Sequence, residues 1–406
     1  MNRSRSIRSR LILCGLSVIS VLQLTGCWDR VEVNDIAIIV GAGIDQVSAN
    51  QVKLSAEIYI PEESNAETQS GGSKSASGNG KTFVSSASGS SMSEAMYKLQ
   101  ERLSRKLYWG HNDIFVFGQK RAAQGIDDDL DFIMRYVRMR ERANVYVAEG
   151  RAVDILGINP RLEPNSMEAL SELSKTEIST TVDLKQVIER IVETPEETFC
   201  VPYLNPGSLL TGESHIRKPN VSYFQGMSIF NKTKMVGWMN NDLTWGYFWI
   251  TNRIKANTII AVGHHPHNET VAVQLTNSKT KLVPHITPGG KWIMKIIVRS
   301  QGNMMQNTTE IDFMNPKEHA ELVELVSEEV QISIKNTMRE LQKKIKVDAV
   351  DFGNSFRKKY PKQWNNVKTN WNETFQQVQL EFDVQVSIPR PGVLNQTIRQ
   401  MKGGNH

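Results

Sequence analysis

The chain has 406 residues, of which 39% are hydrophobic and 22% charged, and its formal net charge is +5. This composition is typical of a soluble globular protein, and the length is sufficient for two or three domains. Four arginines lie within the first ten residues, and without them the chain carries 44 basic and 43 acidic residues. That balance argues against a nucleic-acid-binding surface, which needs a concentrated basic field, so we expect no nucleic-acid partner.

The first 26 residues have the order of a bacterial lipoprotein signal. A basic start precedes an apolar run from Leu11 to Leu24, and the run ends at Leu24-Thr25-Gly26-Cys27. An aliphatic residue, two small residues and cysteine form a lipobox, so residues 1–26 are predicted to be a signal peptide and Cys27 the lipidation site. Two acyl chains on Cys27 would hold the protein on a membrane, where one chain holds only marginally. The alternatives are an ordinary signal with a chance cysteine, or an uncleaved helix.

The cysteine count excludes an internal disulfide in the exported chain. Cys14 would leave with the signal, Cys27 would carry lipid, and only Cys200 would remain. An exported domain with one thiol must fold without disulfide support. We expect Cys200 to be a buried, inert thiol rather than a reactive one.

The region 27–200 is predicted to be an α+β domain, because apolar runs and amphipathic segments alternate along it. A Ser/Gly-rich stretch at 62–80 has almost no apolar residue and is predicted to be a mobile loop, either a tolerated insertion or a functional segment. Gly41 and Gly43 lack the third glycine of a nucleotide-binding loop, which makes that interpretation weak. The expected strands are 36–40, 52–60 (antiparallel to the first), 81–86, 114–118 and 143–148, and the expected helices 93–107, 127–140, 167–173 and 181–192.

A middle, β-rich domain is predicted at 201–275, after prolines 195, 202 and 206 break the chain. It would contain a hairpin of strands 219–229 and 234–238, followed by strands at 259–262 and 271–275. Five aromatic residues between 238 and 250 favour a core or a domain interface, and a cage for a small ligand is the alternative.

A C-terminal α+β domain is predicted at 276–400. Asn315 and Pro316 are typical of a helix start, and apolar residues recur at helical spacing from Leu322 to Ile345. They predict a helix over 316–346, about 45 Å long, with its apolar face across a sheet. The sheet would include strands 281–285, 292–299, 309–313 and 378–388, and short helices are expected at 355–360, 361–364 and 371–375.

Three groups of residues are candidates for chemistry, and each has a simpler interpretation. His111 and Asp113 could form an acid–base pair, but a turn-capping role is favoured because no nucleophile is near. The arginines at 135, 138, 140 and 142 could bind an anion, but a solvated helix end is favoured. His264, His265 and His267 lack a partner ligand at the usual spacing, so no metal site is expected.

Several sequence blocks resemble the Ger(x)C (GerAC-like) family of spore germination lipoproteins. The similarity covers nearly the whole chain, and the first and last blocks are the specific ones. The stretch 62–80 departs from the family pattern. The matching blocks are Cys-Trp-Asp-Arg at 27–30, Asn-Asp at 34–35, Gly-Ala-Gly-Ile-Asp at 41–45, Gly-Met-Ser-Ile-Phe at 226–230, Val-Gly-Trp at 236–238 and Asp-Phe-Gly-Asn-Ser-Phe-Arg-Lys-Lys-Tyr-Pro-Lys-Gln-Trp at 351–364.

The resemblance implies three α+β domains, each a mainly antiparallel or mixed sheet with flanking helices. It implies a non-enzymatic C subunit of a nutrient germinant receptor, without catalytic residues or cofactors, on the outer face of the spore inner membrane. Its expected partners are two integral-membrane subunits of the A and B type. Two other hypotheses stay open: a lipid-anchored solute-binding protein that uses the aromatic stretch, and a surface enzyme that uses His111 or His264.

Overall fold

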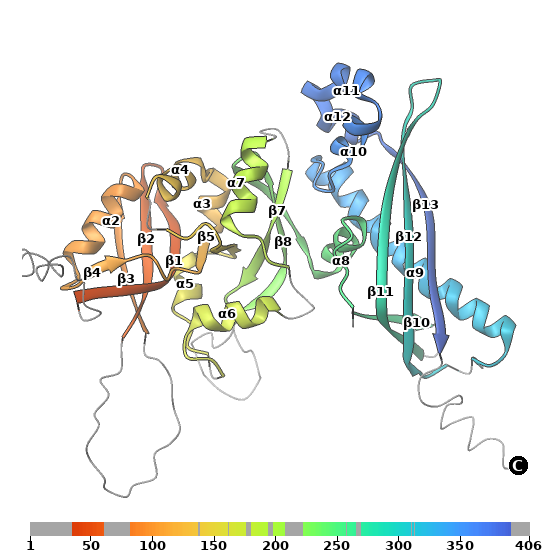
Figure 1. Ribbon diagram of the computed structural model, residues 1–406, viewed down its shortest axis with the longest axis horizontal. Helices are drawn as coiled ribbons and strands as arrows, with labels where there is room; N and C mark the ends of the chain where they lie inside the picture. The colour runs from red at the N-terminus through yellow and green to blue at the C-terminus, as the bar shows by residue number, and fades with distance from the viewer. Residues whose placement is uncertain are drawn as a thin grey trace, which may run out of the picture.

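The computed structural model shows two β-sheets with helices packed against them (Figure 1). This arrangement confirms the predicted α+β class with mixed sheets. Cys27 and the 62–80 stretch lie outside the described residues. The structure describes residues 35–60, 82–136, 139–160, 162–175, 180–193, 198–207, 222–256, 258–264, 269–309, 311 and 313–390.

The first sheet is mixed, with strand order β3-β2-β1-β5-β6-β7-β8-β9 and β4 beside β1. Parallel pairing joins β1 to β5, β5 to β6 and β6 to β7, while both ends of the sheet are antiparallel. The predicted antiparallel pairing of the first two strands and the predicted hairpin are confirmed. The strands are β1 (Ile36–Ser48), β2 (Gln51–Tyr59), β3 (Thr82–Gly89), β4 (Lys106–Tyr108), β5 (Ile114–Gly118), β6 (Asn144–Ala148), β7 (Thr198–Asn205), β8 (Tyr223–Asn231) and β9 (Lys234–Asn240).

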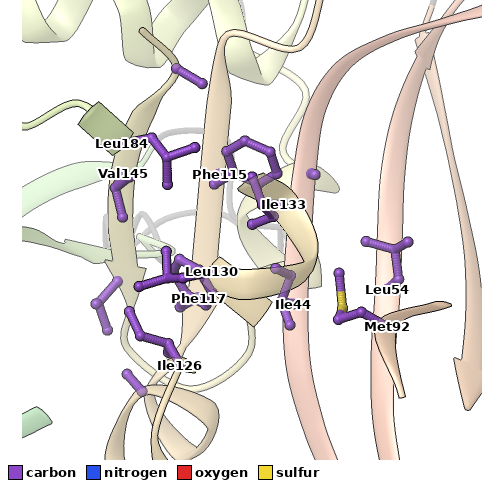
Figure 2. Packing of buried hydrophobic residues seen from close by; sticks show 14 of the residues in the cluster. Ile44, Leu54, Met92, Phe115, Phe117, Ile126, Leu130, Ile133, Val145 and Leu184 are labelled. Carbon is purple, nitrogen blue, oxygen red and sulfur yellow. The ribbon is translucent and has the colours of Figure 1, made fainter. Parts of the chain in front are cut away.

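Helices cover both faces of this sheet. Phe115 and Phe117 of β5 belong to one apolar cluster with residues of α2, α4 and α7, as Figure 2 shows for part of it. Their neighbours Ile114 and Val116 belong to a second cluster with α5 and α6. Two-sided burial explains why β5 is a continuous apolar run. The helices are α2 (Met92–Glu101), α3 (Gln119–Gln124), α4 (Asp127–Arg135), α5 (Ala152–Leu156), α6 (Ser166–Lys175) and α7 (Leu184–Glu193).

The second sheet has the order β10-β11-β12-β13, with β13 parallel to β12 and the other pairs antiparallel. The apolar face of α9 packs on this sheet, as the sequence predicted, in a cluster with Met294, Ile296 and Val298 of β12. The elements are α8 (Asn241–Ile250), β10 (Ile259–His264), β11 (Glu269–Ile286), β12 (Trp292–Asn307), α9 (Pro316–Arg339), the π-helical turn η2 (Glu340–Ile345), α10 (Phe352–Lys359), α11 (Pro361–Val367), η3 (Lys368–Asn370), α12 (Trp371–Phe375) and β13 (Gln379–Arg390).

The long helix starts as predicted, since the Asn315 side chain accepts a hydrogen bond from the main-chain N–H of Lys317 and Pro316 occupies the first turn. Regular α-helix stops at Arg339, and one π-helical turn follows. Lys346 then ends the turn in a left-handed conformation with φ of 63°. Within the described residues, none of the helices combines the length and apolar character that a membrane crossing requires.

Several predicted elements differ from the structure. The predicted strand 309–313 is wrong, because Ile311 lies outside any strand and Phe313 lies in a turn. The Asn307 side chain accepts hydrogen bonds from the N–H and hydroxyl of Thr309, so local side-chain bonds replace a strand ladder there. The helix expected at 93–107 ends at Glu101, where the Gln100 side chain bonds to the main chain of Arg105 and Leu107.

Two further corrections concern strand continuity. The strands predicted at 271–275 and 281–285 are parts of one strand, β11. Pro202 does not break the chain but lies inside β7. Since β7 pairs with β6 only at Tyr203 and Leu204, one edge of the strand is unpaired at Pro202, where a proline is tolerated. The division into domains 27–200, 201–275 and 276–400 stays a prediction, and its internal boundaries fall within β7 and β11.

Candidate functional site

A pocket of about 630 Å³ lies where α7 and β7 of the first sheet meet α8, β11 and the segment before α10. We call it the junction pocket. Its wall combines polar and charged side chains with an apolar floor, and both sheets contribute to it. The side chains that matter below are Arg190, Cys200, Tyr247, Arg253, Thr280 and Asp351.

The α7 wall is tied to the segment before α10 by an ion pair. The guanidinium of Arg190 lies 3.7 Å from the carboxylate of Asp351, and both side chains are about two-fifths exposed. Asp351 has a left-handed backbone with φ of 62° and directly precedes α10. An exposed pair of this kind contributes roughly 0–1 kcal/mol, so it orients the two elements more than it stabilises them.

The floor of the pocket contains Cys200 of β7 and Tyr247 of α8, which share a hydrogen bond. Burial raises the pKa of the Cys200 thiol to about 12 and raises the pKa of the Tyr247 hydroxyl as well. A thiol with so high a pKa is neutral at physiological pH and a poor nucleophile. The predicted burial of Cys200 is confirmed.

The C-terminal end of α8 places two polar side chains at the pocket. Asn252 has a left-handed φ of 58°, and its side-chain oxygen accepts a hydrogen bond from the main-chain N–H of Thr280 at 2.7 Å. The guanidinium of Arg253 lies 5.8 Å from the ring centroid of Tyr247, a cation–π arrangement. The side chain of Asn252 thus fixes the end of α8 against β11.

The segment before α10 is organised by a buried carboxylate. Asp348 accepts hydrogen bonds from the main-chain N–H groups of Val350, Phe352 and Gly353 and from the indole of Trp371. Burial raises the pKa of Asp348 to about 6, and these hydrogen bonds oppose the rise. The carboxylate satisfies donors at the start of α10 and thereby sets the position of Asp351 at the pocket.

The other side of α10 faces an aromatic cluster. The ring of Trp371 contacts those of Phe356 and Trp364. Trp292 of β12 joins them, with its ring centroid 4.7 Å from that of Phe356 and 5.7 Å from that of Trp371. Gly353 lies below two of these indoles, and a Cβ there would approach Trp371 to 2.8 Å. The block 351–364 therefore has two roles: one side of α10 builds the core and the other lines the pocket.

The predicted acid–base pair is not assembled. The carboxylate of Asp113 accepts a hydrogen bond from Arg140, while the ring of His111 lies 5.8 Å from that of Tyr108. Arg135 likewise pairs with Asp131, at 2.8 Å on the exposed face of α4. These pairs favour the solvated-surface interpretation of the basic cluster.

The histidine candidates cannot be placed as ligands. His265 and His267 lie outside the described residues, as does Arg138. Among the described residues, no three potential metal ligands come together.

The aromatic stretch is mainly core. Tyr247, Phe248 and Trp249 are each less than 5% exposed, and Trp238 stacks on Tyr203 at 5.0 Å. Trp245 and Trp249 also line a second groove, of about 720 Å³, between α8 and α9. The preferred interpretation as core and interface is thus confirmed for these three side chains.

Sequence reasoning missed the residues that define the junction pocket. Arg190, Arg253 and Thr280 belong to three segments far apart in the sequence, and no motif joins them. Asp348 precedes the block 351–364, and a carboxylate four residues before the helix start at Phe352 was the available signal. These residues come together only because the two sheets and their helices pack against each other. Local sequence patterns do not encode that packing.

Comparison with known proteins covers nearly the whole chain. Residues 29–206 match the spore germination protein N-terminal domain, and residues 225–392 match the domain described as spore germination B3/GerAC like, C-terminal. Among relatives from Bacillus subtilis, spore germination protein KC is 26% identical over 96% of this chain and 98% of its own length. The putative spore germination protein YfkR is 25% identical over 97% of this chain and all of its own length.

The fold agrees with a solved structure of this group. The crystal structure of the GerBC protein matches with a TM-score of 0.56 and 18% identity, over 86% of this chain and 97% of that one. The two domain matches and the fold agree with the resemblance found in the sequence blocks. The chain belongs to the GerAC-like family of spore germination proteins.

Proposed function

We propose that this chain is the lipid-anchored, non-enzymatic C subunit of a nutrient germinant receptor. It acts on the outer face of the spore inner membrane beside integral-membrane subunits of the A and B type. The observation that carries the proposal is the similarity to spore germination proteins, which extends over 96–97% of this chain. The lipobox at 24–27 supports the membrane attachment.

The non-enzymatic role is supported by how the candidate residues are used. Asp113 pairs with Arg140, and Cys200 is a buried thiol with a raised pKa. Asp348 satisfies the donors at the start of α10, and polar residues of the 351–364 block line a pocket, which suits a protein that positions partners or ligands.

The proposed lipid anchor is tested by replacing Cys27 with alanine, in a spore-forming host from which the native gene for this protein has been deleted. We expect the variant to lose acyl mass, to leave the membrane fraction and to respond poorly to nutrients. Cys200→Ala is the matched control, because it removes a cysteine but keeps the lipobox. A Cys27→Ala protein that stays acylated would refute the lipid anchor, and a full nutrient response from a released protein would refute the need for it.

The receptor role is tested separately by crosslinking in spore membranes. We expect the anchored chain to be captured with two multi-span proteins, and the capture to fail after Cys27→Ala. Capture with neither multi-span protein, under conditions where the chain remains on the membrane, would contradict the role as a subunit.

A further inference from the structure

We propose that the junction pocket binds a small organic carboxylate, held by Arg253 and the hydroxyl of Thr280 at its polar end. The proposal is independent of the lipid tether and of the receptor partners. It depends on four features of the pocket: the guanidinium of Arg253, a buried hydroxyl, an apolar floor and its two-sided wall.

Two arginines, Arg190 and Arg253, line the pocket. The guanidinium of Arg253 lies 5.8 Å from the ring centroid of Tyr247 in the floor. Arg190 is paired with Asp351 across the pocket. Among the described residues, no carboxylate lies within ion-pair distance of Arg253. A planar guanidinium binds a carboxylate through two parallel hydrogen bonds, which makes Arg253 the natural contact for an anion.

The second feature is the hydroxyl of Thr280. Its oxygen is buried and has no hydrogen-bond partner among the described residues. The main-chain N–H of Thr280 donates to Asn252, next to Arg253, so the hydroxyl lies close to the end of α8. A buried polar group without a hydrogen-bond partner destabilises the folded protein. A ligand oxygen at this position would accept the missing hydrogen bond.

Size and floor restrict the ligand to a small molecule. A volume of about 630 Å³ falls in the range typical of small-molecule sites. The apolar part of the lining comes from Val187, Phe199, Ile250 and Leu282. These side chains suit a short hydrocarbon body, while the polar groups at one side suit a single anionic end.

The wall of the pocket comes from both sheets, which gives binding a structural consequence. Arg253 and Thr280 belong to the C-terminal half, while Val187 and Phe199 belong to α7 and β7. A bound carboxylate would contact both sides at once and add to the connection that the Arg190–Asp351 pair makes. Occupation of the pocket would therefore stabilise the junction.

The test is equilibrium dialysis of the full mature chain in neutral detergent, with radiolabelled butyrate and succinate as probes and butanamide as the neutral control. We expect saturable binding of at least one carboxylate and none of butanamide. Arg253→Gln should weaken binding by about tenfold or more, since it removes a charged hydrogen bond. Thr280→Val should weaken it several-fold, and Thr280→Ser should restore it.

The matched control is Arg299→Gln, which removes an exposed arginine that pairs with Asp383 on the second sheet. It should bind the probe like the parent chain, and the melting temperatures of all variants show whether they are folded. Three results would overturn the proposal: no saturation by either carboxylate up to about 10 mM, a folded Arg253→Gln variant that binds as the parent does, or equal binding of butanamide. Inorganic phosphate bound as tightly as the carboxylates would replace the proposal with an adventitious ion only.

Discussion

The indole Nε1 of Trp371 donates a hydrogen bond to the carboxylate of Asp348 at 2.7 Å. The same carboxylate accepts from three main-chain N–H groups at the start of α10. One buried side chain thus holds together α10, α12 and the wall of the junction pocket.

Replacing Asp348 by alanine should destabilise the protein by about 3 kcal/mol, because four buried donors lose their acceptor. Urea unfolding followed by tryptophan fluorescence measures the change. Asp383→Ala is the control, since Asp383 is paired with Arg299 on the surface and its loss should cost less than about 1 kcal/mol. Equal costs for the two variants would contradict the role of Asp348.

The raised pKa of Asp348 predicts a pH dependence. Its pKa is about 6 in the folded state against an ordinary value of 3.8, so the folded state binds the proton more tightly between these values. Its contribution to stability is therefore full below pH 4, falls as the pH rises to 6, and is constant above. The cost of Asp348→Asn should accordingly be smaller at pH 7 than at pH 4, by roughly 1–3 kcal/mol. A cost independent of pH would show that the carboxyl titrates normally.

A buried ion pair in the first half offers a double-mutant test. The Arg121 guanidinium donates to Asp129 at 2.6 Å, both side chains are almost fully buried, and burial raises the pKa of Asp129 to about 6. Arg121→Met should cost about 3–5 kcal/mol because it leaves a buried carboxylate without its partner. The double variant with Asp129→Leu should recover part of that loss in urea unfolding. Additive costs would indicate that the two groups do not interact.

Close packing of α8 on α9 depends on Gly246. A Cβ there would overlap with the hydroxyl of Thr337 and the main-chain oxygen of Ser333. Gly246→Ala should separate the helices and lower stability by about 1–3 kcal/mol, despite the better helix propensity of alanine. Gly263→Ala is the control, because a Cβ at Gly263 meets nothing within 4 Å. Thermal melting of both variants decides, and equal melting temperatures would contradict the close approach.

The Cys200 thiol should resist alkylation in the folded protein. Its pKa is raised to about 12 by burial, so the thiolate is scarce at pH 8. Iodoacetamide followed by peptide mass analysis should label it only after denaturation. Rapid labelling under native conditions would show that β7 and α8 open at the junction pocket.

Local sequence patterns were sufficient to predict helices and strands whose side chains are buried in a core. Continuous apolar runs predicted β1 and β5, and the recurrence from Leu322 to Met338 predicted the face of α9 that is buried against the second sheet. Asn315 and Pro316 predicted the start of α9 because a cap is a local interaction.

The wrong predictions concern residues whose structure is set by particular contacts rather than by a pattern along the sequence. Pro202 is accommodated because β7 is unpaired on one edge, which depends on its neighbour β6. The Asn307 side chain bonds to Thr309 directly after β12, where a strand was predicted at 309–313. The pocket residues Arg253 and Thr280 meet through the packing of α8 on β11, which has no sequence period.

The parallel pairing of β12 with β13 has a consequence for biosynthesis. All of α9 to α12 lies between these strands, and Val386 and Ile388 of β13 complete the core under α9. A chain that emerges N-terminus first therefore cannot close its second sheet until its last strand is released. Until then the apolar side of α9 is incompletely covered, and quality-control proteases or chaperones have a time window in which to act on the unfinished chain.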